Sequence, residues 1–124
     1  MKITNIRCVK YVFPIDRVFT DANAIEGRNV FAGMVVYVDT DDGVSGMNPF
    51  ASPGDEPLIN ALASLIIGKD PRGVIGLWKL MIDHVFKGGN RGSASSMISA
   101  IDVALWDLKA KINNEPLWKT LGGS

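Results

Sequence analysis

The 124-residue sequence has one cysteine, one histidine and no excess of charge of either sign. A single cysteine, Cys8, cannot form an internal disulfide, so a reducing compartment is expected. Zinc sites need several convergent ligands, and Cys8 and His84 stand far apart in the chain, so no metal site is predicted. The 13 basic and 13 acidic residues cancel, which removes any long-range attraction to nucleic acid or to an anionic membrane.

Long apolar runs are also missing. The longest, such as residues 62–67 and 34–38, are too short to cross a bilayer, and the first residues lack the apolar stretch of a signal peptide. We therefore expect a cytoplasmic protein with no membrane and no nucleic-acid partner. The remaining composition, 47% hydrophobic and 21% charged, is that of one ordinary globular domain.

The first half of the chain has the residue types of β-strands. Three stretches, rich in β-branched and aromatic residues, predict strands: residues 3–13, 29–40 and 44–47. Pro14 is expected to end the first strand, and Asp41-Asp42-Gly43 is expected to turn the second into the third. The stretches 15–28 and 48–55 have no clean period and predict two loops.

The second half changes to a helical period of about 3.6 residues. Asp55 is expected to cap a first helix that Gly68 ends, and Asp70-Pro71 to open a second, with Trp78 on its apolar side. A third helix is expected from Ser93 or Ser95 to Asn113-Asn114. Together these elements predict an α+β domain, a three-stranded antiparallel β-meander followed by a three-helix bundle.

No assembled active site can be recognised among these residues. The acidic residues at 39, 41 and 42 surround a glycine turn and are interpreted as a solvated hairpin tip. His84 is interpreted as a packing or surface residue near a helix C-terminus. The glycine-rich stretch 88–92 lacks the Lys-Ser/Thr of a phosphate-binding loop and is interpreted as a helix connection. We therefore predict no catalytic residue and no metal ligand in this chain.

One segment carries a specific resemblance. Residues Ser99–Lys111, followed by Glu115-Pro116-Leu117 and Leu121-Gly122-Gly123, closely resemble the signature that closes the capping domain of mandelate racemase and muconate lactonizing enzymes, in the enolase superfamily. The rest of the chain is similar in its order of elements. Met97 replaces a small alanine of the family pattern and Thr120 replaces an apolar residue, departures that affect subgroup rather than family.

The resemblance implies a larger enzyme. Members of this family pair such an N-terminal domain with a C-terminal β/α barrel that carries Mg²⁺ ligands and acid–base residues. The barrel removes the proton α to a carboxylate, and dehydration, racemisation or cycloisomerisation follows. Among these we favour an acid-sugar dehydratase or a racemase. The implied partners are the missing barrel, a small carboxylate substrate (an acid sugar or a hydroxy acid) and, as is common in the family, further copies in a homo-oligomer. The chain alone is expected to be inactive.

The family's capping domain encloses the substrate with two loops, which by position resemble residues 14–28 and 47–55 here. Arg17 is expected to pair with a substrate carboxylate or bond sugar hydroxyls, and Asn48 to read a hydroxyl. Aromatic and thioether side chains are expected to wall the pocket. The substrate-binding candidates are Arg17, Phe19, Asp21, Met47, Asn48 and Phe50.

The third helix supplies candidates for contact with the barrel, namely Asp102, Trp106 and Lys109. Asp102 borders the apolar stripe, where a carboxylate requires a partner. Asp107 is expected to point away from that stripe and to form a surface pair with Lys111. An alternative function is a stand-alone binding or assembly module with this fold. A capping domain separated from its barrel should expose a large apolar face, whereas an independent module should cover it.

Overall fold

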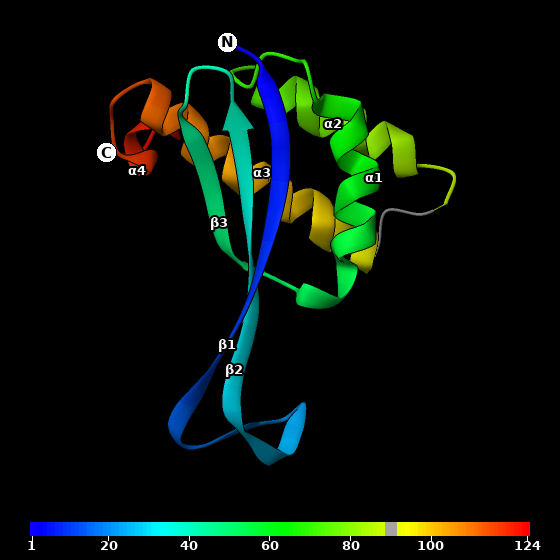
Figure 1. The fold of residues 1–124 in the computed structure, drawn as a ribbon, viewed down its shortest axis with the longest axis vertical. Coiled ribbons are helices and arrows are strands. Elements are labelled where there is room, and N and C mark those ends of the chain that lie inside the picture. The colour runs from blue at the N-terminus through cyan, green and yellow to red at the C-terminus, as the bar shows by residue number, and fades with distance from the viewer. Residues whose placement is uncertain (89–91) are drawn as a thin grey trace.

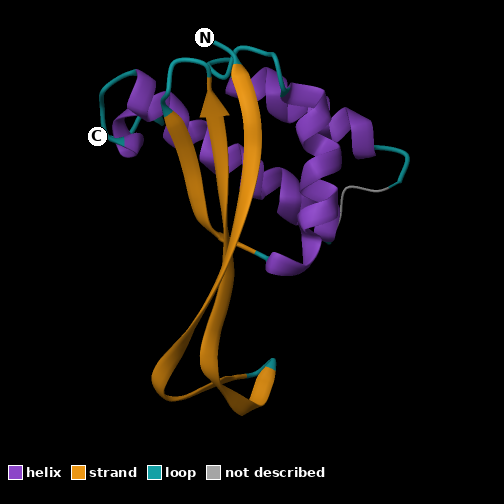
Figure 2. Ribbon diagram, viewed as in Figure 1, coloured by secondary structure: helices purple, strands orange, loops and turns teal. Residues whose placement is uncertain are grey.

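The computed structural model describes residues 1–88 and 92–124, with the backbone alone at Asp55. Figures 1 and 2 show a sheet with helices on one side and a long hairpin that projects beyond both. The elements follow one another along the chain as β1 (Ile3–Asp21), β2 (Ala24–Thr40), β3 (Ser45–Ala51), η1 (Pro53–Asp55), α1 (Glu56–Ile66), α2 (Val74–Val85), α3 (Ser93–Ile112) and α4 (Leu117–Thr120). The predicted α+β architecture is confirmed.

The sheet is an antiparallel meander in the order β1-β2-β3, as predicted. Gly43 has φ of 80°, a backbone conformation that glycine adopts without strain, and its N–H donates to the carbonyl of Thr40 at 3.3 Å. The predicted turn between the second and third strands is therefore confirmed. β3 is longer than expected, because it continues to Ala51, which pairs with Met34.

The prediction of a long loop over residues 15–28 is wrong. β1 continues through Pro14 to Asp21, and β2 begins at Ala24, so that the segment forms the outer half of a long hairpin. The pairing shifts register between Pro14 and Phe19 and again between Phe19 and Asp21. Such irregularities disturb the alternation of side chains, which is why the sequence showed no strand period. Pro14 is tolerated because β1 is an edge strand.

The core lies between the inner face of the sheet and the helices. Met34, Val36 and Val38 alternate along β2 and are fully buried, as expected for a strand with one covered face. α3 packs most closely on β3 at Gly46, where an added Cβ would collide with the carbonyl oxygen of Ala104 and with Leu108. A side chain at this position would hold the helix away from the sheet, so this close approach requires glycine.

The helices agree with the predictions except in detail. α1 begins at Glu56 and ends at Ile66, shortly before Gly68; the predicted capping role of Asp55 concerns a side chain outside the described residues. α2 starts at Val74 rather than at Pro71, because Asp70 forms a turn in which its carboxylate accepts a bond from the N–H of Arg72 at 2.9 Å.

Further differences follow along the chain. Trp78 is exposed rather than part of the core, so its predicted place on the buried side of α2 is wrong. The predicted connection at 88–92 contains residues 89–91, which lie outside the described residues. The sequence did not predict the short α4. Among the described residues, no helix combines the length and the apolar character needed to cross a bilayer.

Asp107 joins α3 to the sheet. Its Oδ2 accepts a bond from the N–H of Met47 at 2.8 Å and lies 2.7 Å from Nζ of Lys111, which also donates to the carbonyl of Ser45 at 3.0 Å. The pair with Lys111 is confirmed, and the bond from Met47 adds a link to β3 that the sequence did not predict. The helix twist places Asp107 beside Ala104 and Leu108, next to the free edge of β3, which offers an unpaired N–H.

Of the three acidic residues at 39, 41 and 42, the first has a structural role and the other two lie in the turn. Asp39 accepts bonds from Arg7 Nε at 2.5 Å and from Ser45 Oγ at 2.6 Å, and so joins all three strands. The hydrogen bond from Arg7 lowers the pKa of the Asp39 carboxyl below its usual value. The guanidinium of Arg7 also lies 4.3 Å above the ring of Tyr37. For Asp39 the interpretation as a solvated tip is therefore wrong.

Candidate functional site

The outer half of the β1–β2 hairpin carries exposed apolar side chains. β3 pairs with β2 from Asp39 to Met34, and beyond Met34 the hairpin continues as a two-stranded ribbon (Figure 1). Phe19 is 62% exposed and Ile25 is 83% exposed. Other large apolar residues exposed on the same hairpin are Val12, Phe13, Val18, Val30 and Phe31. Large apolar side chains that are exposed in such number on one segment are typical of a binding site.

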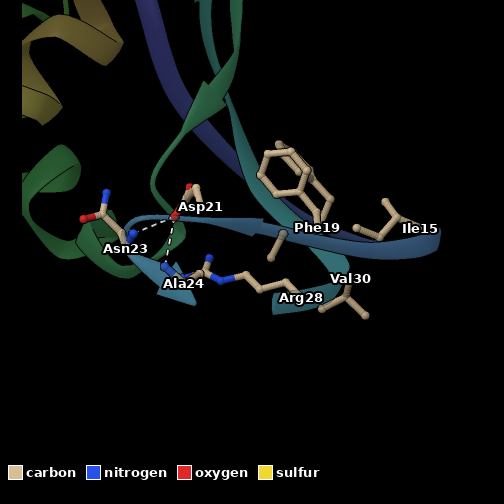
Figure 3. Close-up of a pocket in the computed structure, with 9 residues that line it drawn as sticks. Ile15, Phe19, Asp21, Asn23, Ala24, Arg28 and Val30 are labelled. Atoms are coloured by element: carbon tan, nitrogen blue, oxygen red, sulfur yellow. Dashed lines mark hydrogen bonds between the residues drawn. The ribbon is translucent and has the colours of Figure 1, made fainter. Parts of the chain in front are cut away.

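The tip of the hairpin is built by Asp21. One oxygen of its carboxylate accepts bonds from the backbone N–H groups of Asn23, at 2.7 Å, and Ala24, at 2.9 Å (Figure 3). Such an Asx turn replaces missing backbone partners in a two-residue connection. Asp21 therefore has a structural role at the tip. The sequence analysis had named it only as a candidate for substrate binding.

A hollow of about 600 Å³ lies along this tip, with apolar walls and a polar rim. Its lining residues are Ile15, Phe19, Asp21, Asn23, Ala24, Arg28, Val30, Phe31 and Ala32. Figure 3 shows the side chains of Ile15, Phe19, Arg28 and Val30 around it. Arg28 is the cross-strand partner of Phe19, and both residues line the hollow. This combination suits a small ligand with an anionic group.

The structure brings together Phe19 and Asp21 from the predicted site and adds Arg28, which the sequence interpretation missed. Arg17 lies on β1, as Phe19 and Asp21 do. It is exposed and is not among the residues that line the hollow. The register shift between Pro14 and Phe19 decides which arginine lies there. A one-residue slip in pairing exchanges the two faces of a strand. Because the sequence interpretation treated this segment as a loop, it gave no basis for choosing between Arg17 and Arg28.

Tyr11 fixes the base of the hairpin to β3. Its ring crosses β2 over Gly33, where an added Cβ would collide with the ring, and its hydroxyl donates to the carbonyl of Pro49 at 2.6 Å. The ring stacks on Phe13 and Phe31 with centroids 6.1 and 6.2 Å away. The aromatic stack and the hydrogen bond therefore hold the projecting hairpin in a defined direction relative to the end of β3.

The second predicted loop contributes little to the hollow. Asn48 is 8% exposed, its Nδ2 donates to the carbonyl of Ala100 at 3.2 Å, and its Oδ1 accepts the N–H of Phe50 at 3.1 Å. Both polar groups of the amide thus have partners inside the chain, and the expectation that Asn48 reads a substrate hydroxyl stays a prediction. Met47 is half-buried on the sheet, and Phe50 is strongly exposed near the end of β3. Neither of them lines the hollow.

A second surface lies on the side of α3 turned away from β3. Asp102, Trp106 and Lys109 are all half-buried there, and Nζ of Lys109 lies 5.2 Å from the centroid of the Trp106 ring. Burial raises the pKa of the Asp102 carboxyl, an effect that the Trp106 indole partly offsets. His84, in contrast, is exposed in the last turn of α2, one of the two positions expected for it.

Comparison with known proteins shows to which family this architecture is similar. The model of the family described as "Mandelate racemase / muconate lactonizing enzyme, N-terminal domain" matches residues 20–122. The chain is 30% identical to a D-galactarolactone cycloisomerase of Agrobacterium fabrum over 125 aligned residues, an alignment that covers 99% of the chain and 32% of the relative.

Two solved structures have the same fold. The 3,6-anhydro-D-galactonate cycloisomerase from Zobellia galactanivorans has a TM-score of 0.81 and 28% identity, with 99% of this chain and 32% of that one covered. An L-talarate dehydratase from a Polaromonas species, complexed with Mg and L-glucarate, has a TM-score of 0.79 and 30% identity, with 98% and 35% covered.

The present chain thus spans about a third of the length of the proteins that it resembles. Those relatives are named as cycloisomerases and a dehydratase of acid sugars. The match with the family model extends over most of the described elements, from the outer hairpin to the end of α4. The chain therefore belongs to the mandelate racemase / muconate lactonizing enzyme family of the enolase superfamily, and it corresponds to the N-terminal domain of that family.

Proposed function

We propose that this chain is the capping domain of an enzyme that removes the α-proton of an acid sugar and then dehydrates or cycloisomerises it. The observation that carries the proposal is the projecting hairpin, which Tyr11 joins to β3 and whose exposed apolar hollow is lined in part by an arginine. A hairpin of this kind can close over a reaction centre that a second domain supplies. The activities for which the relatives are named, which include dehydration and cycloisomerisation of acid sugars, support the same substrate class.

The exposed apolar surface favours a capping domain over a stand-alone module. An independent module would cover its apolar surface, whereas the hairpin leaves residues such as Phe19 and Ile25 in solvent. When a second domain covers them, the hairpin excludes water from the substrate, which strengthens every electrostatic interaction inside. The reacting groups themselves would belong to that second domain.

Arg28 has the most direct role that we propose for a residue of this chain. Its guanidinium would pair with the end of the substrate remote from the reacting carbon, either with a second carboxylate or with hydroxyls. Phe19, on the paired position of the opposite strand, would pack on the carbon skeleton. Arg17, which the sequence favoured for this task, would remain at the outer surface of the hairpin.

Magnesium belongs to the proposed enzyme rather than to this chain. Within residues 1–88 and 92–124, no group of three or more His, Cys, Asp or Glu side chains is arranged to hold a metal ion. The described residues therefore do not fit a Mg²⁺ site, and we derive no step through the metal here. In the proposed enzyme the ion would be held by the barrel and would stabilise the charge that forms when the α-proton leaves.

The Asp102 surface of α3 is our candidate for contact with the barrel. A half-buried carboxylate that burial makes harder to ionise gains most from a partner that donates a hydrogen bond or a positive charge. In a protein with the barrel attached, Asp102→Ala should weaken the contact between the domains and lower the thermal midpoint. The matched control is Asp83→Ala, which removes an exposed carboxylate on α2.

The proposal is tested on the gene from which this chain comes, read beyond the codon of Ser124. We expect a barrel to follow, and the complete protein, supplied with Mg²⁺, should transform at least one acid sugar in a panel of aldonic, aldaric and lactone substrates. The chain by itself should transform none of them. A stop codon at that point, or a complete protein that is inactive on the whole panel, would overturn the proposal.

The role of Arg28 has its own readout. In the complete enzyme, Arg28→Ala should raise KM at least about tenfold with a smaller change in kcat, because substrate binding weakens while the reacting groups stay in place. Arg17→Ala is the matched control, since it removes the same charge from the same hairpin outside the hollow. Equal effects of the two substitutions would contradict the assignment.

A further inference from the structure

β3 contains a β-bulge close to its end, near the point where the hairpin projects from the sheet (Figure 1). The β2–β3 pairing shifts register between Met34 and Val36, where β3 has one residue more than β2. The stretch that takes up the difference is Pro49-Phe50, and a bulge tolerates proline because it interrupts the ladder of backbone bonds. A bulge also redirects a side chain, and here the ring of Phe50 is left 78% exposed.

A single peptide group of this bulge is bonded on both sides. The carbonyl of Pro49 accepts a hydrogen bond from the hydroxyl of Tyr11 at 2.6 Å, and the N–H of Phe50 donates to Oδ1 of Asn48 at 3.1 Å. This carbonyl and this N–H belong to the same planar peptide unit, so the two bonds together fix the plane from which the Phe50 side chain departs. One bond is local to β3, whereas the other comes from β1.

The reach of Tyr11 to β3 depends on Gly33. The two residues are partners in the β1–β2 pairing, and the Tyr11 ring passes over Gly33 to reach the third strand. An added Cβ at Gly33 would collide with the ring and with its hydroxyl. A side chain at position 33 would therefore move the hydroxyl away from Pro49, so this hydrogen bond requires a glycine there.

The Tyr11 ring also belongs to the aromatic stack that supports the hollow. It stacks on Phe31 with centroids 6.2 Å apart, and Phe31 lines the hollow. Phe13 stacks on both rings, with centroids 6.1 Å from Tyr11 and 5.3 Å from Phe31. One side chain thus contacts a wall of the hollow with its ring and orients Phe50 with its hydroxyl.

A second link between the base of the hairpin and the rest of the chain leads elsewhere. Nζ of Lys10 lies 3.1 Å from Glu56 at the start of α1, and both side chains are at least one third exposed. Exposed ion pairs of this kind contribute little to stability, and this one involves neither the bulge nor the residues of the hollow. The route through Tyr11, in contrast, joins Phe31 to Phe50.

We propose that Tyr11 is a positioning residue that couples the hollow of the hairpin to Phe50, so that the two apolar surfaces meet a substrate as one unit. The inference rests on the proposed function for the existence of that substrate. Tyr11 acts through the ring of Phe31 and through the peptide between Pro49 and Phe50, without contact to the substrate. A ligand that displaces the wall of the hollow therefore changes the direction of Phe50, and by linkage the reverse also holds.

Nuclear magnetic resonance of the 124-residue chain tests the coupling without any substrate. Phe13→Ala removes one ring of the stack and should shift the backbone N–H resonance of Phe50, because the Tyr11 ring then takes a different position. In a Tyr11→Phe background the same substitution should shift that resonance at most about one third as much, since the ring remains but its hydroxyl is gone. A Gly33→Ala background, which displaces the hydroxyl, should have the same effect.

The matched control for this measurement is Val12→Ala. Val12 is next to Tyr11 and Phe13 on β1, and its side chain lies on the opposite face of the strand because side chains alternate. This substitution should leave the Phe50 resonance in place in every background.

Kinetics of the complete enzyme test whether the coupling serves binding. Tyr11→Phe should raise KM about threefold to fivefold with a smaller change in kcat, whereas Tyr37→Phe should change neither. Phe19→Ala combined with Phe50→Ala should raise KM by less than the product of the single effects, because the loss of either surface already ends the joint contact. In the Tyr11→Phe background the two effects should multiply.

The proposal would be overturned by a Phe50 resonance that does not respond to Phe13→Ala, or by one that responds equally with and without the Tyr11 hydroxyl. Effects of Phe19→Ala and Phe50→Ala on KM that multiply in both backgrounds would also overturn it. A complete protein that is inactive on every acid sugar would overturn the proposed function instead, and the resonance measurement would still decide the coupling.

Discussion

The two halves of the β1–β2 hairpin have similar residues and opposite surroundings. In the inner half, Met34, Val36 and Val38 are fully buried beneath the helices. In the outer half, Phe13, Phe19 and Phe31 are each more than 40% exposed. Both halves belong to the same two strands, so the difference between them comes from what covers the strands.

Different features stabilise the two halves of the hairpin. The inner half is stabilised by burial, about 25 cal/mol for each Å² of apolar surface removed from water. A two-stranded ribbon without such a cover is only marginally stable. The outer half therefore depends on local devices, namely the Asp21 turn, the stack of three aromatic rings and the bond from Tyr11 to Pro49. A partner domain would supply the missing cover.

The largest expected difference between the halves is in the cost of losing an isoleucine. Ile101→Ala, in the buried face of α3, should lower the free energy of unfolding by about 2–5 kcal/mol, because a cavity remains. Ile25→Ala, in the exposed outer half, should change it by less than about 0.5 kcal/mol. Urea unfolding followed by circular dichroism measures both. Similar costs would mean that the outer half is packed in solution.

Two glycines outside the hairpin, Gly46 in β3 and Gly76 in α2, are expected to respond in opposite ways to an added methyl group. Gly46→Ala should lower the free energy of unfolding by about 1–3 kcal/mol, because the new methyl group pushes α3 away from β3. Gly76→Ala, in the interior of α2 where an added Cβ meets no atom within 4 Å, should instead raise it by about 0.5–1 kcal/mol. The same unfolding measurement separates the two, and opposite signs are required.

The attachment of the hairpin to the body is tested at Tyr11. Tyr11→Phe removes the bond to Pro49 and should cost about 1 kcal/mol, with faster amide hydrogen exchange in the outer half of the hairpin than in the helices. Tyr37→Phe is the control, because the hydroxyl of Tyr37 bonds to no described residue. If exchange rises equally throughout the chain, the bond stabilises the whole domain and does not orient the hairpin.

The smallest expected effect is a pH dependence of the free energy of unfolding, which should arise from Asp39 in the inner half of the hairpin and not from the outer half. Because Arg7 lowers the pKa of Asp39 in the folded chain, the stabilisation is present above the ordinary value near 3.8 and is lost as the pH falls through the lowered pKa. Asp39→Asn should lower stability by up to about 1 kcal/mol at pH 7, and the difference should vanish in acid. Asp16→Asn, in the outer half, should show no such difference at either pH.

Much of the fold was predictable because the signals are local. The helical spacing of α3, the Asp-Gly turn before β3 and the β-branched run in β2 each depend on residues close in sequence. The family resemblance likewise rests on one continuous segment. The hairpin beyond Pro14 was not predictable, because register shifts hide the alternation on which strand recognition depends.

The α+β class, the order of the strands and the three long helices, and the family could all be predicted, since they depend on periodicity and on a continuous motif. Contacts between distant parts of the chain, in contrast, depend on the tertiary structure. It placed Arg28 rather than Arg17 at the hollow, turned the amide of Asn48 into the core and joined Asp107 to the edge of β3. Each of these outcomes depends on strand register or on a contact between residues far apart in the chain, and neither is encoded in a local pattern.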